Sequence, residues 1–262
     1  MLEIRGAAGR VATQLLITVL VAPFVFPLWS MLQGSLAGDG LGNYSSVLGL
    51  PQLPAFFRNS LLIAVCTVVL VYASTMLASF ALAKLPFVGK EVLFYVLLLA
   101  LTMPSAALTV PLFITVQRLG LLDSFVAVIL PLTALAIPLN VLLARGFIAA
   151  LPDELFEAAR LDGCGTLRTF WHLVLPLIRP ISAVVVVWTF VGAWNEYLLP
   201  LLFLQSPTNQ TITQLPQFFS TQYGSDQTKI IAGAVIITLP TVIVYLALQK
   251  LFERGLTAGA IK

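Results

Sequence analysis

Charged side chains are scarce in this chain of 262 residues. Asp, Glu, Lys and Arg together make up 10% of it, whereas apolar residues make up 59% and the mean hydropathy is +1.00. A soluble domain usually carries about 25% charged residues. The deficit excludes an ordinary soluble domain and predicts a protein embedded in a membrane. The net charge of +3 comes without a basic, aromatic-rich surface, so it does not indicate nucleic-acid binding.

The residue types that carry catalysis are also scarce. His172 is the one histidine, and Cys66 and Cys164 are the only cysteines, with no ligand-spaced neighbours that would indicate a metal site. No Gly-x-x-x-x-Gly-Lys-Ser/Thr run is present to bind ATP phosphates. The sequence therefore predicts no catalytic residue, no metal and no cofactor in this chain. Any energy must come from another polypeptide.

Long apolar runs dominate instead. A helix needs about 20 residues to cross the hydrocarbon of a bilayer, and helices satisfy their own backbone groups there. We predict an all-α polytopic membrane protein with six transmembrane helices. Five of the apolar runs are free of charge, and the run 180–204 holds a single acid, Glu196. The runs in chain order are 11–38, 59–83, 92–117, 124–144, 180–204 and 230–249.

The basic residues predict the orientation of these spans. With a cytoplasmic N-terminus, only Arg58, Arg118 and Lys229 of the 14 basic residues fall in outer segments. The positive-inside rule therefore places both termini in the cytoplasm. The first run could be a secretory signal, but it is longer than the usual apolar core and contains Pro23 and Pro27, so we predict an uncleaved helix. Residues 1–262 are predicted to form a single membrane domain.

The inner segment 145–179 is the longest charged interruption of the chain. Pro152 suits a first helical turn, the acids Asp153 and Glu154 suit the positive end of a helix dipole, and Gly163 suits the position just past its end. We predict a short helix over 152–162. One face of it, at helical spacing, carries Leu155, Ala158, Ala159 and Asp162.

A second short helix should complete a cytoplasmic hairpin. Thr166 is expected to cap it, and Pro176 and Pro180 to end it before the fifth span. The hairpin has two interpretations from its pattern alone. It can fit a groove on a soluble protein, with Glu157 and Arg160 at the rim, or it can lie as an amphipathic segment on the lipid surface.

The order of residues in this hairpin resembles a known family. Glu157-Ala158-Ala159, Gly163, Leu173 and Leu175-Pro176 look like the EAA loop of permease subunits in binding-protein-dependent ABC importers, with Leu173 in place of the usual Ile. Asn59-Ser60-Leu61, Trp194-Asn195-Glu196-Tyr197 and the tail 254–262 are similar to the maltose-transporter-like carbohydrate permeases, specifically the shorter partner of a two-permease pair. The similarity spans nearly the full chain.

This resemblance implies a multi-pass subunit of a bacterial or archaeal plasma (inner) membrane that passes a carbohydrate or related solute into the cytoplasm. Its implied partners are a second, different permease, two ATPase subunits that hold ATP and Mg, and an extracytoplasmic solute-binding protein. Two sets of residues would meet the ATPases. The coupling set is Glu157, Ala158, Ala159, Asp162 and Gly163, and the C-terminal set is Gly255, Leu256, Thr257 and Gly259.

The outer segment 205–228 corresponds in that family to a loop that contacts the binding protein. Its candidate contacts are Gln217, Phe218, Phe219 and Tyr223, although polar and aromatic groups also suit an ordinary solvated loop. Glu196 and Asn195 are candidates for the translocation path, because an acid at membrane depth usually faces a cavity or a partner. At headgroup level Glu196 loses that significance. Asn140 is a weaker candidate that could instead form an interhelical hydrogen bond.

Two other classes of protein fit less of the sequence. An ion-coupled secondary transporter of a small polar solute would use several ionisable groups within its spans, and it would leave the charged hairpin unexplained. A membrane-embedded enzyme would need a cluster of His, Asp or Cys near the membrane surface. The sequence predicts no such cluster.

Overall fold

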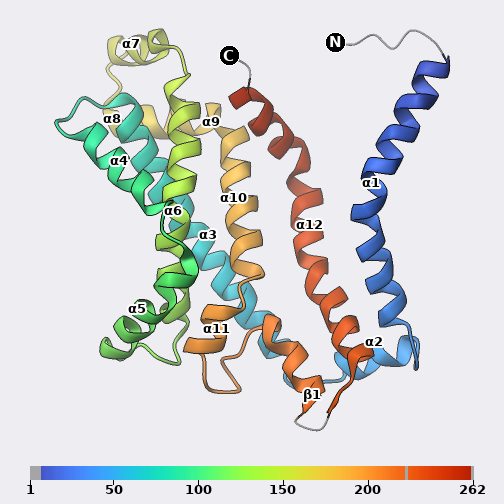
Figure 1. The fold of residues 1–262 in the computed structure, drawn as a ribbon. Helices are drawn as coiled ribbons and strands as arrows, with labels where there is room; N and C mark the ends of the chain where they lie inside the picture. The colour runs from blue at the N-terminus through green and yellow to red at the C-terminus, as the bar shows by residue number, and fades with distance from the viewer. Residues whose placement is uncertain (1–6, 222–223, 261–262) are drawn as a thin grey trace. The chain divides into compact units, whose positions relative to one another are not determined.

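The computed structural model describes residues 7–221 and 224–260, and in the last stretch it describes only the backbone from residue 251 onward. Almost all of this part is helical (Figure 1). Besides the turns and irregular connections between helices, it contains one short antiparallel pair, in which β1 (Ser220–Thr221) lies against β2 (Gly224–Ser225). The all-α prediction is therefore confirmed in its coarse form.

The helices follow the apolar runs, with short helices between them. In chain order they are α1 (Ala7–Ser35), α2 (Leu41–Leu48), α3 (Leu53–Lys84), α4 (Lys90–Ala100), α5 (Ser105–Arg118), α6 (Phe125–Ala149), α7 (Asp153–Leu161), α8 (Thr166–Thr169), η1 (Phe170–Val174), α9 (Leu175–Leu177), α10 (Arg179–Trp194), α11 (Leu198–Phe203), η2 (Ile212–Phe219) and α12 (Gln227–Ala260).

Four helices in the described part of the chain are long and apolar enough to cross a membrane unaided: α1, α3, α6 and α12. The third and fifth predicted spans are broken. Within the third, between α4 and α5, the axis bends by 98°. A second bend, of 80°, lies just before the fifth predicted span, where the α8–α9 segment meets α10. Counting each bent pair as one span gives up to six, so the six-span topology stays a prediction. Pro104 at the N-cap of α5 accounts for the first break, because the residue before a proline is driven out of helical geometry.

The fifth predicted span, 180–204, is also wrong as one continuous helix. Its helix α10 ends at Trp194, and the six-residue α11 begins only at Leu198. The intervening residues Asn195, Glu196 and Tyr197 form a non-helical connection.

The chain divides into two compact units. The first comprises residues 1–53 and 215–238. Within it, the Asn43 side-chain amide donates to the carbonyl oxygens of Ser35 at 2.9 Å and Ala37 at 2.8 Å, which closes the turn between α1 and α2. A Cβ added to Gly34 would lie 3.0 Å from Ile231, so α1 and the start of α12 approach closely at that glycine.

The second unit comprises residues 54–214 and 239–262, and its core lies between α3, α6, η1 and α10. Apolar side chains supply this core because burial removes them from solvent. Phe80 of α3 packs against Phe170 of η1 with ring centroids 5.4 Å apart. The buried members of the cluster are Val71, Met76, Phe80, Ala144, Ile148, Phe156, Phe170, Val174, Ile178, Ile181, Val184 and Val185.

Segments predicted to lie on one side of the membrane meet at one end of this unit. Lys84 contacts Leu151 and Asp153, and Arg145 pairs with Glu91 at 2.8 Å. All of these belong to predicted inner segments or their borders. Figure 1 shows α7 and α8 at this end of the unit and α5 and α11 at the opposite end.

Candidate functional site: the hairpin and the outer loop

The predicted hairpin helix exists as α7, and local signals set both of its ends. Pro152 occupies the N-cap position in extended geometry, and Asp153 and Glu154 lie in the first turn. Gly163 adopts a left-handed φ of 71° just past the C-terminus. The amide of Gly163 donates to the Arg160 carbonyl and that of Cys164 to the Ala159 carbonyl, at 3.0 and 2.9 Å. This is a Schellman motif, which favours glycine at that position.

Phe156 attaches α7 to the rest of the second unit. Its side chain is 7% exposed and belongs to the same buried cluster as Phe170 and Ile148. The face that the sequence predicts for docking points elsewhere. Leu155, Ala158 and Asp162 are exposed, and Ala159 is half-buried. Because the Ala side chains are small and project little from this surface, another polypeptide can approach its backbone closely.

Lys84, the last residue of α3, joins three elements at the root of α7. Its ammonium donates to the carbonyl oxygen of Leu151 at 2.8 Å and to the carboxylate of Asp153 at 2.6 Å. It also lies 4.7 Å from the centroid of the Phe156 ring, within range of a cation–π contact. The hydrogen bond and the charge of Lys84 lower the pKa of Asp153, so this pair is intact at neutral pH.

The second half of the hairpin departs from its prediction in two details. Gly165, rather than Thr166, occupies the N-cap position, and no side chain caps the helix. Pro176 lies inside α9 and does not end it, because the segment continues through Leu177 and turns only at Ile178. Between α8 and α9 the backbone widens into the π-helical turn η1, whose Phe170 and Val174 are buried while Trp171 is 61% exposed.

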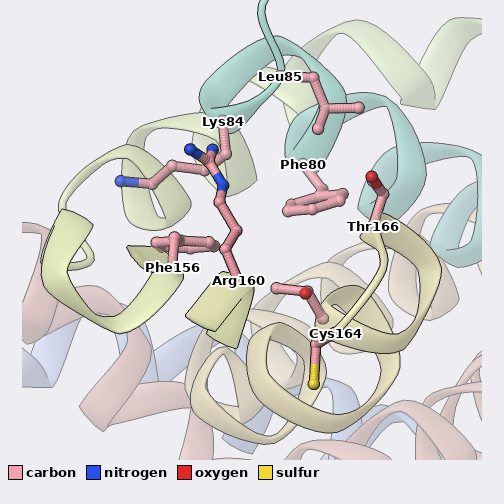
Figure 2. A pocket seen from close by; sticks show the side chains of 8 residues that line it. Phe80, Lys84, Leu85, Phe156, Arg160, Cys164 and Thr166 are labelled. Atoms are coloured by element: carbon pink, nitrogen blue, oxygen red, sulfur yellow. The ribbon is translucent and has the colours of Figure 1, made fainter. Parts of the chain in front are cut away.

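Two hollows flank α7. One, of about 60 Å³, is shown in Figure 2, where the side chains of Phe80, Phe156 and Arg160 surround it. The other, of about 180 Å³, lies between Lys84, Asp153 and Glu157 and shares Phe156 and Arg160 with the first. The hairpin is therefore held at one end of α7 and underpacked along its flank.

At the opposite end of the second unit, polar side chains hold the start of the outer loop. The Asn59 amide donates to the carbonyl oxygens of Thr208 at 2.8 Å and Gln210 at 2.9 Å. The neighbouring Ser60 hydroxyl accepts from the Ile212 amide at 2.8 Å. The Asn59-Ser60 pair of the sequence resemblance thus fixes the path of residues 208–212.

Among the predicted contacts of the outer loop, Gln217 and Phe218 are exposed and Phe219 is half-buried. Tyr223 lies outside the described residues. Gly255, Leu256, Thr257 and Gly259 fall in the helical backbone of α12, but their side chains also lie outside the described part.

The three candidates for the translocation path lie in two different settings. Asn195 is exposed after α10, and the half-buried Glu196 accepts from the Leu199 amide at 3.0 Å, so it caps the start of α11. Asn140 of α6 is fully buried. Its amide donates to Ala136 at 2.9 Å and approaches Thr189 of α10 at 3.5 Å, while its side-chain oxygen has no partner. The structure therefore brings Asn140 against α10, in the geometry of an interhelical contact.

Sequence reasoning missed Phe156 and Lys84 as positioning residues. It also missed Asp123, whose carboxylate accepts from the amides of Gln205 and Ser206 at the start of the outer loop. Each acts through a contact with residues far away in the chain, so no local pattern identified it. The one sign of this role in the sequence is that Phe156 is a large apolar residue, next to another apolar residue, in an otherwise charged helix. Across residues 7–221 and 224–260, no three His, Cys, Asp or Glu side chains gather closely enough to hold a metal ion.

Comparisons with known proteins show relatives in sequence and in fold. The chain is 32% identical to the melibiose/raffinose/stachyose import permease protein MelC of Bacillus subtilis, over 98% of each chain. It is 31% identical to the diacetylchitobiose uptake system permease protein NgcG of Streptomyces coelicolor, over 84% of this chain and 74% of the relative. Its fold matches a crystal structure of a bacterial ABC transporter involved in import of the acidic polysaccharide alginate, with a TM-score of 0.79, 20% identity and coverage of 95% and 99%.

The family model described as "binding-protein-dependent transport system inner membrane component" matches residues 74–258, well over half of the sequence. This stretch contains the whole hairpin from Asp153 to Leu177. The match favours the importer over an ion-coupled secondary transporter or a membrane-embedded enzyme. The chain belongs to the family of inner membrane components of binding-protein-dependent transport systems, and it is a multi-pass permease subunit rather than an enzyme.

Proposed function

We propose that this chain is one of two different permease subunits of an ATP-driven importer, and that α7 docks into a cleft of a separate ATPase subunit. Two such ATPases bind ATP and Mg. An extracytoplasmic binding protein delivers the solute. Residues 1–262 act as a single membrane domain in this assembly, with six crossings and both termini in the cytoplasm.

The observation that carries this proposal is that α7 is attached to the second unit by one side and exposes the other. Phe156 and Lys84 hold one side of the helix to the second unit, whereas Leu155, Ala158 and Asp162 face away from it. A helix lying on lipid would turn its apolar side outward and leave charges on top. Here the bulky apolar residue, Phe156, is buried in the core of the second unit. The outward face mixes small, apolar and acidic groups, which suits a groove on a protein.

The solute is a carbohydrate or a related compound. MelC is named for the import of melibiose, raffinose and stachyose and NgcG for the uptake of diacetylchitobiose, and both match this chain over most of its length. A further relative, 35% identical over 85% of this chain, is the osmoprotective compounds uptake permease protein GgtD of Synechocystis. The names of MelC and NgcG support a carbohydrate, and that of GgtD supports a related compound.

The other predicted contacts complete the mechanism. When ATP closes the two ATPases, α7 is displaced, and the helices turn from facing inward to facing outward. Gly255, Leu256, Thr257 and Gly259 reach between the ATPases. Gln217, Phe218, Phe219 and Tyr223 meet the binding protein, and Asn195, Glu196 and Asn140 contribute to the path of the solute.

Crosslinking tests the docking proposal. In a chain whose Cys66 and Cys164 are replaced by Ser, Ala158→Cys is expected to crosslink to the co-expressed ATPase in membranes, because residue 158 lies on the outward face of α7. Val88→Cys serves as the control, since residue 88 is fully exposed at the same end but lies outside the hairpin. Capture of lipid alone at residue 158, with no ATPase in the complex purified in mild detergent, would contradict the proposal.

A further inference from the structure

Lys84 is an unusual residue to find with so little access to solvent. Its side chain is only 10% exposed, although a lysine normally keeps its ammonium in water. Three contacts compensate for the lost hydration: the Leu151 carbonyl, the Asp153 carboxylate and the face of the Phe156 ring. An ammonium carries three donors and a point charge, so it can serve several acceptors at one place.

These contacts join parts of the chain that are far apart in sequence. Lys84 is the last residue of α3, Leu151 lies two residues past the end of α6, and Asp153 and Phe156 belong to the first turn of α7. One side chain therefore fixes the starting point of α7 against the cytoplasmic ends of two long helices. Its partner Asp153 is 82% exposed, so the pair remains at the surface of the fold on one side.

The rest of α7 has looser surroundings. The two hollows begin beside Lys84 and Phe156 and extend along the helix to Arg160, and Leu161 at its end is 89% exposed. A force applied to the outward face of α7 would tilt the helix into this space unless its root is rigid. The contacts of Lys84 supply that rigidity, together with the buried Phe156 ring.

We propose that Lys84 is the positioning residue that makes α7, α3 and α6 move as one body when the ATPase displaces the hairpin. This inference rests on the proposed docking of α7 and adds the route by which the displacement enters the membrane helices. Without the ammonium, α7 still docks, but its motion is absorbed at its own root and the long helices stay behind.

The test measures whether α7 and the end of α3 keep a fixed separation. Spin labels are placed at Leu161→Cys and Val88→Cys in the Cys66→Ser, Cys164→Ser chain, within the complete importer in lipid nanodiscs. Residue 88 lies just beyond Lys84, and both labelled side chains are exposed. With native Lys84, we expect the same distance distribution without nucleotide and with Mg and a non-hydrolysable ATP analogue. With Lys84→Met, nucleotide should broaden the distribution about twofold or shift it.

Three further variants separate positioning from general damage. Asp153→Asn removes the same ion pair from an exposed residue and should change the distribution in the same direction, while Lys84→Arg keeps a cation and should restore it. Lys90→Met makes the same substitution at the same end, at a residue for which the described structure gives no contact with α7, and it should leave the distribution unchanged. The yield of the crosslink from Ala158→Cys reports docking in every variant.

The outcomes distinguish the two proposals. Loss of the crosslink and of the ATPase from the complex with native Lys84 overturns the proposed function itself. If the ATPase binds and Lys84→Met nevertheless keeps a nucleotide-independent distance distribution, α7 does not need Lys84 and this inference is wrong. A change caused equally by Lys90→Met would also overturn it, because the effect would then follow from lost charge alone.

Discussion

At the scale of single residues, Asp123 shows how one side chain can hold a loop. It is the one described non-glycine residue with positive φ, at 61°, a conformation that Asp tolerates better than most residues. Its carboxylate accepts from the amides of Gln205 at 3.0 Å and Ser206 at 2.9 Å, and from the Ser206 hydroxyl. The backbone amide of Asp123 donates to Phe203 at 2.7 Å. The turn before α6 and the segment after α11 are thus tied together.

Replacing Asp123 by Asn should loosen this tie. Asn keeps the shape, the backbone tolerance and the oxygen that accepts from both amides, but it loses the negative charge that strengthens these bonds and the acceptor of the Ser206 hydroxyl. We expect hydrogen exchange at the amides of residues 205 and 206 to become about fivefold faster, as for the loss of a hydrogen bond worth about 1 kcal/mol. Equal protection in both proteins would show that the carboxylate does not hold the loop.

The pH dependence of this tie follows from the pKa of Asp123, which its hydrogen bonds, chiefly that from the Ser206 side chain, lower from the usual 3.8. A carboxyl whose folded pKa is depressed contributes stability above its unfolded pKa and loses it as the pH falls through the folded pKa. The difference between Asp123 and the Asn variant should therefore be constant between about pH 5 and pH 8, and it should shrink only in stronger acid.

At the scale of elements, α7 is a helix whose ends are encoded locally and whose attachment is not. Pro152, Asp153 and Gly163 predicted its bounds to within a residue, since capping depends on near neighbours. The role of Phe156 depends on α3, α6 and η1, which lie far away in the sequence. The breaks at Pro104 and after Trp194 were missed for a related reason. Composition measures how apolar a run is, whereas the path of its axis depends on packing.

Phe156→Ala tests the attachment of α7. Truncating a buried Phe costs about 3 kcal/mol or more, and the Lys84 ammonium would lose its ring partner as well. We expect hydrogen exchange across residues 153–161 to rise strongly while α6 and α10 keep their protection. Leu161→Ala is the matched control, because that side chain is 89% exposed and its truncation should change stability by no more than about 0.5 kcal/mol. Similar effects of the two variants would argue against Phe156 as the anchor.

At the scale of the whole molecule, segments that Lys and Arg assign to the same side of the membrane lie at the same end of the second unit, while the orientation itself stays a prediction. Lys84 and Arg145, from predicted inner segments, find their partners at one end, while Asn59 and Asp123 hold the outer loop at the other. Charge placement could predict which loops share a side because the positive-inside rule acts on each loop separately. It could not predict the pairs, which require three-dimensional positions.

Thiol labelling in intact cells tests this orientation. In the chain that lacks Cys66 and Cys164, a membrane-impermeant maleimide is expected to label Gln205→Cys, which is exposed in the outer loop. It should label Val88→Cys only after the membrane is opened. The reverse labelling pattern would show that the chain has the opposite orientation. Labelling of both residues in sealed cells would contradict the assignment of residue 88 to the cytoplasm.

The main chain at the bend between α4 and α5 needs surroundings that lipid does not provide. In a six-crossing arrangement it falls midway through the third crossing, and residues 101–106 around it are exposed in the isolated chain. Hydrocarbon offers no hydrogen bonds to an irregular main chain, so such a stretch must rest against protein or face a water-filled space. A single copy of this chain in lipid would leave the main chain of the bend exposed to hydrocarbon. We therefore expect the main chain at this bend, like the outward face of α7, to be covered by a second subunit or by water in the assembled importer.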